Sequence, residues 1–551
     1  MCDVYLITMI LLVMSACKKE VNAPTEISLA VLQNHISQLA SDEFAGRKPF
    51  TAGEEKTVQY LAEQLKGLGL APGNGDSYFQ DVPMVEIEAR PAETMAVMSK
   101  SGESWNLKGG EDYTVYTERL QPRLELKQSE VVFCGYGIVA PEYGKNDYAG
   151  ADLRGKTALV LVNDPGLGSE DSLYFKGNTM TYYGRWTYKF EEAARQGADA
   201  VLIIHETTMA GYPFFVAASS WKSKRLNLKN ARNNEDKCAM QGWVTLDVGK
   251  KMMASAGLDF AEQIKQAKRP EFKPVPMNLQ ISTTLENNFR EDMSRNVVAL
   301  LPGSGAQEEY IIYSAHWDHL GVGVSVSGDS IYNGAMDNAS GTATLLTIAK
   351  AFSEAKTKPS RSVVFLFVTA EEQGLLGSAY YADHPLFPTA HTVANINLDG
   401  MNPNGPMKDL TITGYGHSDM DDLAREEAQK QNRYILPDQE PEKGFFYRSD
   451  HFNFAKVGIP PIFASGGYDH AEKGKDYAMQ KQKEFTANHY HKPSDQYDPI
   501  RWDFGGMMQD AHLFLQLGWR LATTDIRPQW KATSEFKARR DEDLKRAGLK
   551  G

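Results

Sequence analysis

Apolar residues near the amino terminus recur every three or four positions, with polar residues between them. Two such sets follow each other, the first of Leu29, Leu32, Ile36 and Leu39 and the second of Val58, Leu61, Leu65 and Leu68. This spacing places each set on one face of a helix. Glu54 and Glu55 mark the start of the second helix, and Gly67 and Gly69 mark its end. We therefore expect two helices between residues 27 and 72.

Between residues 130 and 282 the pattern changes to short apolar runs separated by glycine-containing turns. Runs at 131–133 and 157–162 predict strands here, and shorter alternating runs at 85–88 and 124–127 predict strands before this region. A helical stretch at 189–196 leads into a further apolar run at 198–204. We interpret this region as a small, β-rich domain with one or two helices. The alternative is that it forms part of one continuous mixed sheet.

From residue 296 onward, apolar runs alternate regularly with helical stretches. Strand-like runs cover 310–314, 363–368 and 393–398, and helical stretches cover 343–355 and 375–383. Strands joined by short helical crossovers predict an α/β fold with a mostly parallel central sheet covered by helices. Binding sites in such sheets lie at the carboxyl ends of the strands. Polar residues of functional type follow each of these three strands.

Length and composition limit the protein class. A chain of 551 residues is too long for one ordinary core, so several domains or one domain with an insertion are expected. Hydrophobic residues make up 42% and charged residues 24%, as in soluble globular proteins. The formal net charge is −12 and no basic stripe is present, so a nucleic-acid partner has no electrostatic support.

The first residues have the character of an export signal. Residues 5–14 are largely apolar, and Ser15, Ala16 and Cys17 precede a polar segment. This run is too short to span a bilayer but suits a signal peptide. Small residues before a cysteine resemble a bacterial lipobox, so we expect a signal peptide over 1–17 and a lipid on Cys17. The only charge of the leader is Asp3, where a basic residue is usual. A buried N-terminal helix is the alternative.

These features lead us to expect an exported protein, lipid-anchored in the bacterial cell envelope on its periplasmic or outer-membrane face. If the leader is removed, only Cys134 and Cys238 remain as unmodified cysteines. Disulfides therefore cannot be the main stabilising element of the fold. Whether these two cysteines form a bridge stays open.

Seven residues of the carboxyl-terminal half are of metal-ligand or acid/base type and follow apolar runs or turns. They are His316, Asp318, Asp337, Glu371, Glu372, Asp399 and His491. Zinc takes imidazole nitrogens and carboxylate oxygens, and two zinc ions that share one carboxylate need about five protein ligands. Each residue also has a simpler interpretation. His316 and Asp318 could be a surface pair, and Asp337 could cap a helix.

Glu371 and Glu372 have the weakest purely structural explanation. They follow a strand of almost pure valine, leucine and phenylalanine, and burying two acids there is costly without compensating cations or hydrogen bonds. Adjacent extended residues also point in different directions, so one glutamate can bind metal while the other faces a water.

The motifs around these residues resemble peptidase family M28, the zinc aminopeptidases. The resemblance rests on residues 314–319, 336–341, 370–378, 397–399 and 490–491, with later landmarks at 449–451 and 458–460. It covers about 27–72 and 296–522. Residues 134–138 and 193–200 resemble the protease-associated (PA) domain that interrupts many metallopeptidases. The expected organisation is a signal peptide (1–17), the first part of the peptidase domain (24–129), an inserted PA domain (130–285), the main peptidase domain (286–530) and a charged tail (531–551).

The resemblance implies roles for individual residues. Asp337 would bridge two Zn²⁺ ions, with His316 and Asp399 on one ion and Glu372 and His491 on the other. Glu371 would be the general base and Asp318 would orient His316. Tyr447 is a weaker candidate for binding the oxyanion of the substrate. The same ligands accept Co²⁺ or Mn²⁺ in place of zinc. Ser449, Asp450 and His451 are consecutive and cannot form a relay, so we interpret them as structural or substrate-lining.

The expected function is removal of N-terminal residues from peptide substrates by a dinuclear zinc exopeptidase. Two alternatives stay open. Relatives with the same metal ligands and inserted domain act as carboxypeptidases, and others are non-catalytic receptor-like modules that lack ligands.

Overall fold

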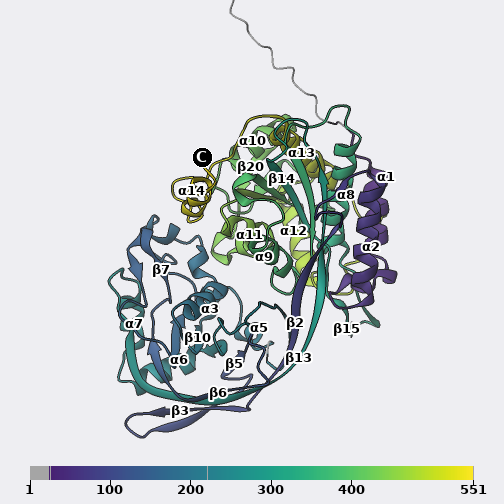
Figure 1. The fold of residues 1–551 in the computed structure, drawn as a ribbon. Coiled ribbons are helices and arrows are strands. Elements are labelled where there is room, and N and C mark those ends of the chain that lie inside the picture. Colours follow the sequence, from purple (N-terminus) through teal and green to yellow (C-terminus); the bar gives the residue numbers. More distant parts are fainter. Residues whose placement is uncertain (1–23, 25, 170, 220, 550–551) are drawn as a thin grey trace, which may run out of the picture.

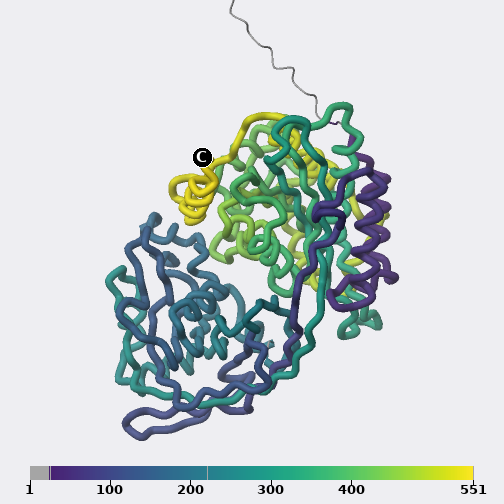
Figure 2. Tube along the Cα trace, viewed as in Figure 1, coloured from purple at the N-terminus to yellow at the C-terminus, as the bar shows by residue number. Residues whose placement is uncertain are grey.

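The chain forms two bodies that are joined by two long strands. The computed structural model describes residues 24, 26–169, 171–219 and 221–549. The joining strands are β2 (Phe79–Pro91) and β13 (Val275–Leu301), which pair antiparallel from Phe79 opposite Val297 to Pro91 opposite Leu285. Figures 1 and 2 show the chain leaving the first body along β2 and returning along β13. The residues between these strands therefore form an insertion.

The first body contains a central sheet in the order β2, β13, β17, β14, β18, β21, β19, β20. Strands β17, β14, β18 and β21 are mutually parallel. The strands of this body are β1 (Ala71–Pro72), β14 (Tyr310–His316), β17 (Ser362–Val368), β18 (Thr392–Asn397), β19 (Asp409–Ile412), β20 (Tyr434–Pro437) and β21 (Pro461–Ser465). A separate hairpin consists of β15 (Gly321–Val326) and β16 (Asp329–Tyr332).

Helices cover both faces of this sheet. They are α1 (Leu29–Leu39), α2 (Ala52–Gly67), α8 (Gly341–Ser353), α9 (Leu376–Asp383), α10 (Met420–Lys430), α11 (His451–Lys456), α12 (Gly474–Asn488), α13 (Gly505–Thr523) and α14 (Lys537–Arg546). In β17, Val363, Phe365 and Phe367 pack in one core, while Val364 and Leu366 pack in another on the opposite face. Burial on both faces explains the unbroken apolar runs of these strands. The predicted parallel α/β sheet is confirmed.

The second body has its own sheet and core. Strands β6 (Arg123–Phe133), β9 (Thr157–Leu161), β10 (Ala200–His205) and β12 (Met240–Thr245) are parallel neighbours. The other strands are β3 (Thr94–Ser99), β4 (Ser104–Lys108), β5 (Tyr113–Tyr116), β7 (Val139–Ala140), β8 (Lys145–Asn146) and β11 (Lys224–Leu228). The helices are α3 (Trp186–Arg195), α4 (Thr207–Ala210), α5 (Phe214–Ala218), α6 (Leu246–Ser255) and α7 (Phe260–Ala267).

Two details of this body differ from the sequence-based expectation. Its core begins at Ala89 and ends at Leu285, so it starts well before residue 130, where we expected the insertion to begin. The reason is that β3 and β6 pair with the first half of β13 and so belong to the second body. The body also contains more helices than the one or two expected.

The charged carboxyl-terminal segment contains buried side chains. Phe536 and Leu544 are buried, and Arg540 is only 5% exposed. The guanidinium of Arg540 donates hydrogen bonds to the carbonyl oxygens of Thr389 and Thr392, both at 2.8 Å. Helix α14 therefore packs on the first body through one apolar side and one buried cation.

Two remaining expectations concern the cysteines and the amino terminus. Cys134 and Cys238 are both buried and both free, so no bridge joins them. Burial raises the pKa of the Cys238 thiol to about 12. The predicted signal peptide and Cys17 lie outside the described residues. No helix within the described part of the chain combines the length and apolar character that crossing a bilayer requires.

Candidate metal centre

Three parallel strands bring the predicted residues to one edge of the sheet. His316 is the last residue of β14, the two glutamates follow β17 after Thr369 and Ala370, and Asp399 follows β18. In the sheet His316 lies opposite Val368, and Ser314 lies opposite Asn397. Since neighbouring parallel strands end at the same edge, the side chains that follow them meet there.

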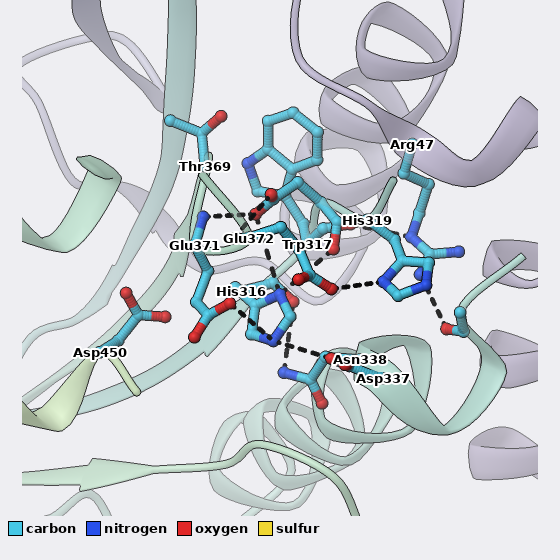
Figure 3. A network of polar contacts seen from close by, with 12 residues as sticks. Arg47, His316, Trp317, His319, Asp337, Asn338, Thr369, Glu371, Glu372 and Asp450 are labelled. Atoms are coloured by element: carbon cyan, nitrogen blue, oxygen red, sulfur yellow. Dashed lines mark hydrogen bonds and ion pairs between the residues drawn. The ribbon is translucent and has the colours of Figure 1, made fainter. Parts of the chain in front are cut away.

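A first group of donor atoms surrounds the imidazole of His316. Its Nε2 lies 3.3 Å from Asp337 Oδ1 and 3.2 Å from Asp399 Oδ1. Glu371 Oε2 is slightly farther, at 4.0 Å from the same nitrogen. Figure 3 shows Glu371 on one side of His316 and Asp337 on the other. His316, Glu371 and Asp399 are close enough together to hold a metal ion.

A second group lies on the other side of Asp337. His491 Nε2 is 3.3 Å from Asp337 Oδ2 and 3.0 Å from Glu372 Oε2. His319, Asp337 and Glu372 also form a group that could hold an ion. The two oxygens of Asp337 thus face one histidine each, which is the arrangement expected of a carboxylate that bridges two ions.

The spacing of these donors suits zinc. Donors about 2.1 Å from a tetrahedral zinc ion lie about 3.4 Å from one another. The distances from His316 and His491 to their carboxylate neighbours, 3.0 to 3.3 Å, are close to this value. The donor set of imidazoles and carboxylates is also the set that zinc prefers. The residues therefore fit a pair of divalent ions.

Asp318 holds the glutamate segment. Its carboxylate accepts hydrogen bonds from the backbone amides of Glu371, at 3.0 Å, and Glu372, at 3.4 Å. His316 Nδ1 forms a hydrogen bond with the backbone carbonyl oxygen of Asp318, at 3.2 Å, whereas the Asp318 carboxylate is 3.8 Å away. An acceptor at Nδ1 leaves Nε2 of the ring free to bind metal.

Two further side chains fix the aspartates. Ser449 donates its hydroxyl to Asp399 Oδ2 at 2.5 Å. The Asp495 carboxylate accepts hydrogen bonds from the backbone amides of Met336, at 3.0 Å, and Asp337, at 3.1 Å. Ser449 thus acts as a structural residue of the site, which agrees with our interpretation of the 449–451 run.

The pKa shifts in this cluster show that its buried carboxylates require nearby positive charge. Burial alone would lower the pKa of His316, but the carboxylates of Glu371 and Asp399 raise it well above its usual value. Burial raises the pKa of Asp318 to about 8. Burial, with the nearby Asp399 and Glu372 carboxylates, also raises the pKa of Glu371 well above its usual value. Buried carboxylates in such number are stable only with cations, and bound dications reverse these shifts.

The sequence did not single out His319. Its Nδ1 is 2.5 Å from Glu372 Oε1, and its ring is fully buried with Nε2 unpartnered. The available signal was its place in the His-Trp-Asp-His run of residues 316–319. Glu372 therefore has one oxygen toward His491 and the other toward His319.

The two tyrosines near the site have different surroundings. The Tyr447 hydroxyl, which we expected to face the oxyanion, donates to the Met180 carbonyl oxygen at 3.1 Å and to Glu535 at 3.2 Å. The ring of Tyr490 instead stacks on His491, with centroids 3.9 Å apart, and remains 46% exposed. Partial burial, followed by the carboxylates of Asp337 and Glu372, raises the pKa of Tyr490 well above its usual value. Of the two tyrosines, Tyr490 is therefore the better candidate for binding the oxyanion of the substrate.

Comparison with known proteins gives a family for part of the chain. Residues 296–515 match the sequence profile of Peptidase family M28. A mouse protein named aminopeptidase NAALADL1 is 32% identical over 138 residues, which is 24% of this chain and 17% of the mouse protein. A protein of Aspergillus oryzae named probable leucine aminopeptidase 2 is 25% identical over 367 residues, 66% of this chain and 56% of that protein. The chain thus spans less than two thirds of either relative.

Solved structures are similar over most of the chain. An aminopeptidase from Aneurinibacillus sp. strain AM-1 covers 92% of this chain and 96% of its own, with 20% identity and a TM-score of 0.48. A zinc aminopeptidase from Bacillus subtilis covers 91% and 97% respectively, with 18% identity and a TM-score of 0.41.

Proposed function

Residues 296–515 form a peptidase family M28 domain, and from that premise we propose that the protein is a two-zinc exopeptidase that removes N-terminal residues from peptides. The observation that carries the proposal is the position of Asp337, whose two oxygens lie 3.3 Å from His316 and 3.3 Å from His491. His316, Asp337 and Asp399 would hold one ion, and Asp337, Glu372 and His491 the other. Co²⁺ or Mn²⁺ would substitute in the same ligands.

The chemistry divides between the ions and the protein. When bound, the zinc ions supply Lewis acidity, which lowers the pKa of a shared water from about 16 toward about 7 and polarises the peptide carbonyl. Glu371 accepts the proton of the attacking water and later donates it to the leaving amine. Asp318 keeps Glu371 in place through the backbone amide. The Tyr490 hydroxyl is the candidate donor to the developing oxyanion.

The test of this proposal is the Glu371→Gln variant. Glutamine keeps the size of the side chain but cannot accept the proton, so peptidase activity should fall about a hundredfold or more while zinc remains bound. Glu484→Gln on the exposed side of α12 is the matched control and should keep wild-type activity. Near-normal activity of zinc-loaded Glu371→Gln would contradict the proposal.

C-terminal cleavage is the second candidate function, and two unpaired arginines favour it. The Nε of Arg185 is buried and has no hydrogen-bond partner in the part of the chain that the structure describes. Arg448 donates to the Lys443 carbonyl oxygen at 2.7 Å, and burial followed by the charge of Arg448 lowers the pKa of Arg185 to about 10. Among the described residues, neither guanidinium has an acidic partner in an ion pair, so together they could bind a substrate carboxylate.

Peptides with blocked ends separate the two candidates. An N-acetylated peptide should resist the proposed aminopeptidase, whereas a C-amidated peptide should be cleaved. The opposite pattern would favour the carboxypeptidase, and Arg448→Met would then raise KM. If the zinc-loaded protein cleaves neither peptide, the result favours a non-catalytic module.

We also propose that the protein is exported and carries a lipid on Cys17, on the basis of the apolar run at 5–14 and the Ser-Ala-Cys sequence that follows. The second body, whose core runs from Ala89 to Leu285, would be a protease-associated domain. Mass spectrometry of the mature amino terminus tests the anchor. An acylated Cys17 and membrane fractionation that is lost in Cys17→Ser are expected, and an unmodified Cys17 in the mature protein would contradict the proposal.

A further inference from the structure

Arg47 lies beneath the candidate metal centre although it belongs to the amino-terminal segment. It is the last residue of a short turn, η1 (Asp42–Arg47), between α1 and α2, and only 1% of it is exposed. Figure 3 shows its guanidinium next to His319. Residue 47 is outside the segment that matches the family profile.

The guanidinium of Arg47 joins three separate parts of the chain through backbone carbonyl oxygens. Nε donates to Trp317 at 2.8 Å, Nη1 donates to Leu39 and to Asn333 at 2.6 Å each, and Nη2 donates to Gly334 at 2.8 Å. Trp317 lies between His316 and Asp318, and Gly334 lies three residues before Asp337. One side chain thus connects the loops that carry ligands of both groups.

The backbone beside Arg47 is shaped for this contact. Gly46 has φ +66, and a Cβ there would lie 2.4 Å from the Tyr332 carbonyl oxygen and 2.7 Å from that of Gly321. Only glycine permits so close an approach. The close approach brings the next residue, Arg47, against the base of the hairpin β15–β16, where the chain leaves the first ligand loop and returns to the second.

The charge of Arg47 also has no direct acidic partner. Among the described residues it forms no ion pair, and its hydrogen bonds go to carbonyl oxygens. Burial lowers its pKa to about 10, against the effect of the carboxylates of Asp318 and Asp495, so the group stays charged at neutral pH. A buried cation without a partner is costly, and burying it beneath an acidic metal site offsets part of that cost.

We infer that Arg47 is a positioning residue of the metal centre, which holds the loops of His316 and Asp337 at the separation that two metal ions require. The inference rests on the proposed function, because it takes the cluster to be a metal site. Groups behind the ligands typically change metal affinity by about 10- to 100-fold when they are removed. The planar fork of arginine fits four carbonyl oxygens, whereas the ammonium of lysine donates only three hydrogen bonds without a fixed plane.

The test compares zinc affinity with stability in three variants. Zinc is titrated against a competing chelator, Co²⁺ absorption reports ligand geometry, and thermal unfolding is measured without metal. Arg47→Met should bind zinc about 10- to 100-fold more weakly and show an altered Co²⁺ spectrum. Arg47→Lys should recover part of the affinity. Arg540→Met is the matched control, because Arg540 is also a buried arginine bound to carbonyl oxygens. It should lower thermal stability and leave zinc affinity unchanged.

Wild-type zinc affinity and an unchanged Co²⁺ spectrum in folded Arg47→Met would overturn the inference. If Arg47→Met does not fold, Arg47→Lys decides, because affinity equal to the wild type would overturn the inference and weaker affinity would support it. Equal loss of affinity in Arg47→Met and Arg540→Met would also overturn it, since the effect would then be general destabilisation. If the wild-type chain binds no zinc, the result contradicts the proposed function itself and not only the role of Arg47.

Discussion

The histidine beside Glu372 gives the first prediction at the scale of single residues. His319→Phe keeps the ring but removes the donor to Glu372 Oε1, which lies 2.5 Å from Nδ1. Glu372 would then be free to rotate away from His491, so zinc affinity at this position should fall about 10- to 100-fold. Dialysis against increasing chelator, followed by elemental analysis, measures the loss. His35→Phe, which changes a buried histidine bound to Tyr60, is the control and should keep wild-type affinity. Two tightly held ions in His319→Phe would refute the role of His319.

The ligand candidates could be predicted from the sequence because each follows an apolar strand or a turn. His316 ends β14, and Glu372 and Asp399 lie a few residues beyond the ends of β17 and β18, which must meet β14 at one edge of a parallel sheet. The only signal for His319 was its place in the 316–319 run, and Arg47 gave none. His319 contacts Glu372 only after β17 and β14 pair, and Arg47 reaches Trp317 across 270 positions of sequence. Contacts of this kind depend on tertiary packing, which spacing does not reveal.

Tyr447 is a residue whose predicted role was wrong because its surroundings depend on tertiary packing. We expected its hydroxyl to bind the oxyanion of the substrate. In the structure, Met180 of the insertion covers it, and both lie in one apolar cluster with Phe446, Phe452, Trp530 and Phe536. The surroundings of this tyrosine therefore depend on how the insertion packs on the first body.

At the scale of elements, the strands of the first body could be predicted from the sequence because both faces of each strand are buried. The packing of the carboxyl-terminal segment was not predicted, because its three buried side chains stand among many charged residues. These side chains are Glu535, Phe536 and Arg540. The side chain of Glu535 is 6% exposed and forms a 2.6 Å ion pair with Lys176 of the insertion. Burial opposes the charge of Glu535, but Lys176 lowers its pKa to about 2. The segment therefore links the two bodies.

Breaking this link should destabilise the protein measurably. Lys176→Met leaves the buried Glu535 carboxylate without its cation, which should cost about 3 kcal/mol in the free energy of unfolding. The double variant Lys176→Met, Glu535→Leu should recover most of this loss. Urea denaturation measures both. Lys537→Met, which breaks an exposed pair with Asp541, is the control and should change stability by less than about 1 kcal/mol. A Lys176→Met protein as stable as the wild type would contradict a linking role.

At the scale of the whole molecule, two bodies with separate cores share only β2 and β13 as continuous strands. The sequence indicated the insertion but placed its start near residue 130, where the pattern changes to apolar runs separated by glycine-containing turns. The second core ends at Leu285 and the first resumes at Val297, so the boundary falls within β13. One strand serving two cores cannot be recognised from local patterns.

Buried histidines should make global stability depend on pH. Burial lowers the pKa of His451 to about 3 and that of His417 to about 4. The folded state keeps both rings neutral, whereas the unfolded chain takes up protons below about pH 6.5. Stability is therefore full above pH 6.5 and is lost as pH falls toward 4 and then 3. His451→Phe should reduce the slope of unfolding free energy by about 1.4 kcal/mol per pH unit between pH 6 and 4. Urea denaturation at several pH values measures the slope, and an unchanged slope would contradict this origin.

The most direct test of the central claim is the number of zinc ions bound per chain. Elemental analysis of the zinc-loaded protein should give two ions for the wild type. Asp337→Ala should retain less than one, because the substitution removes a ligand from both ions. Two ions bound equally well by the wild type and by Asp337→Ala, or none bound by the wild type, would contradict the account.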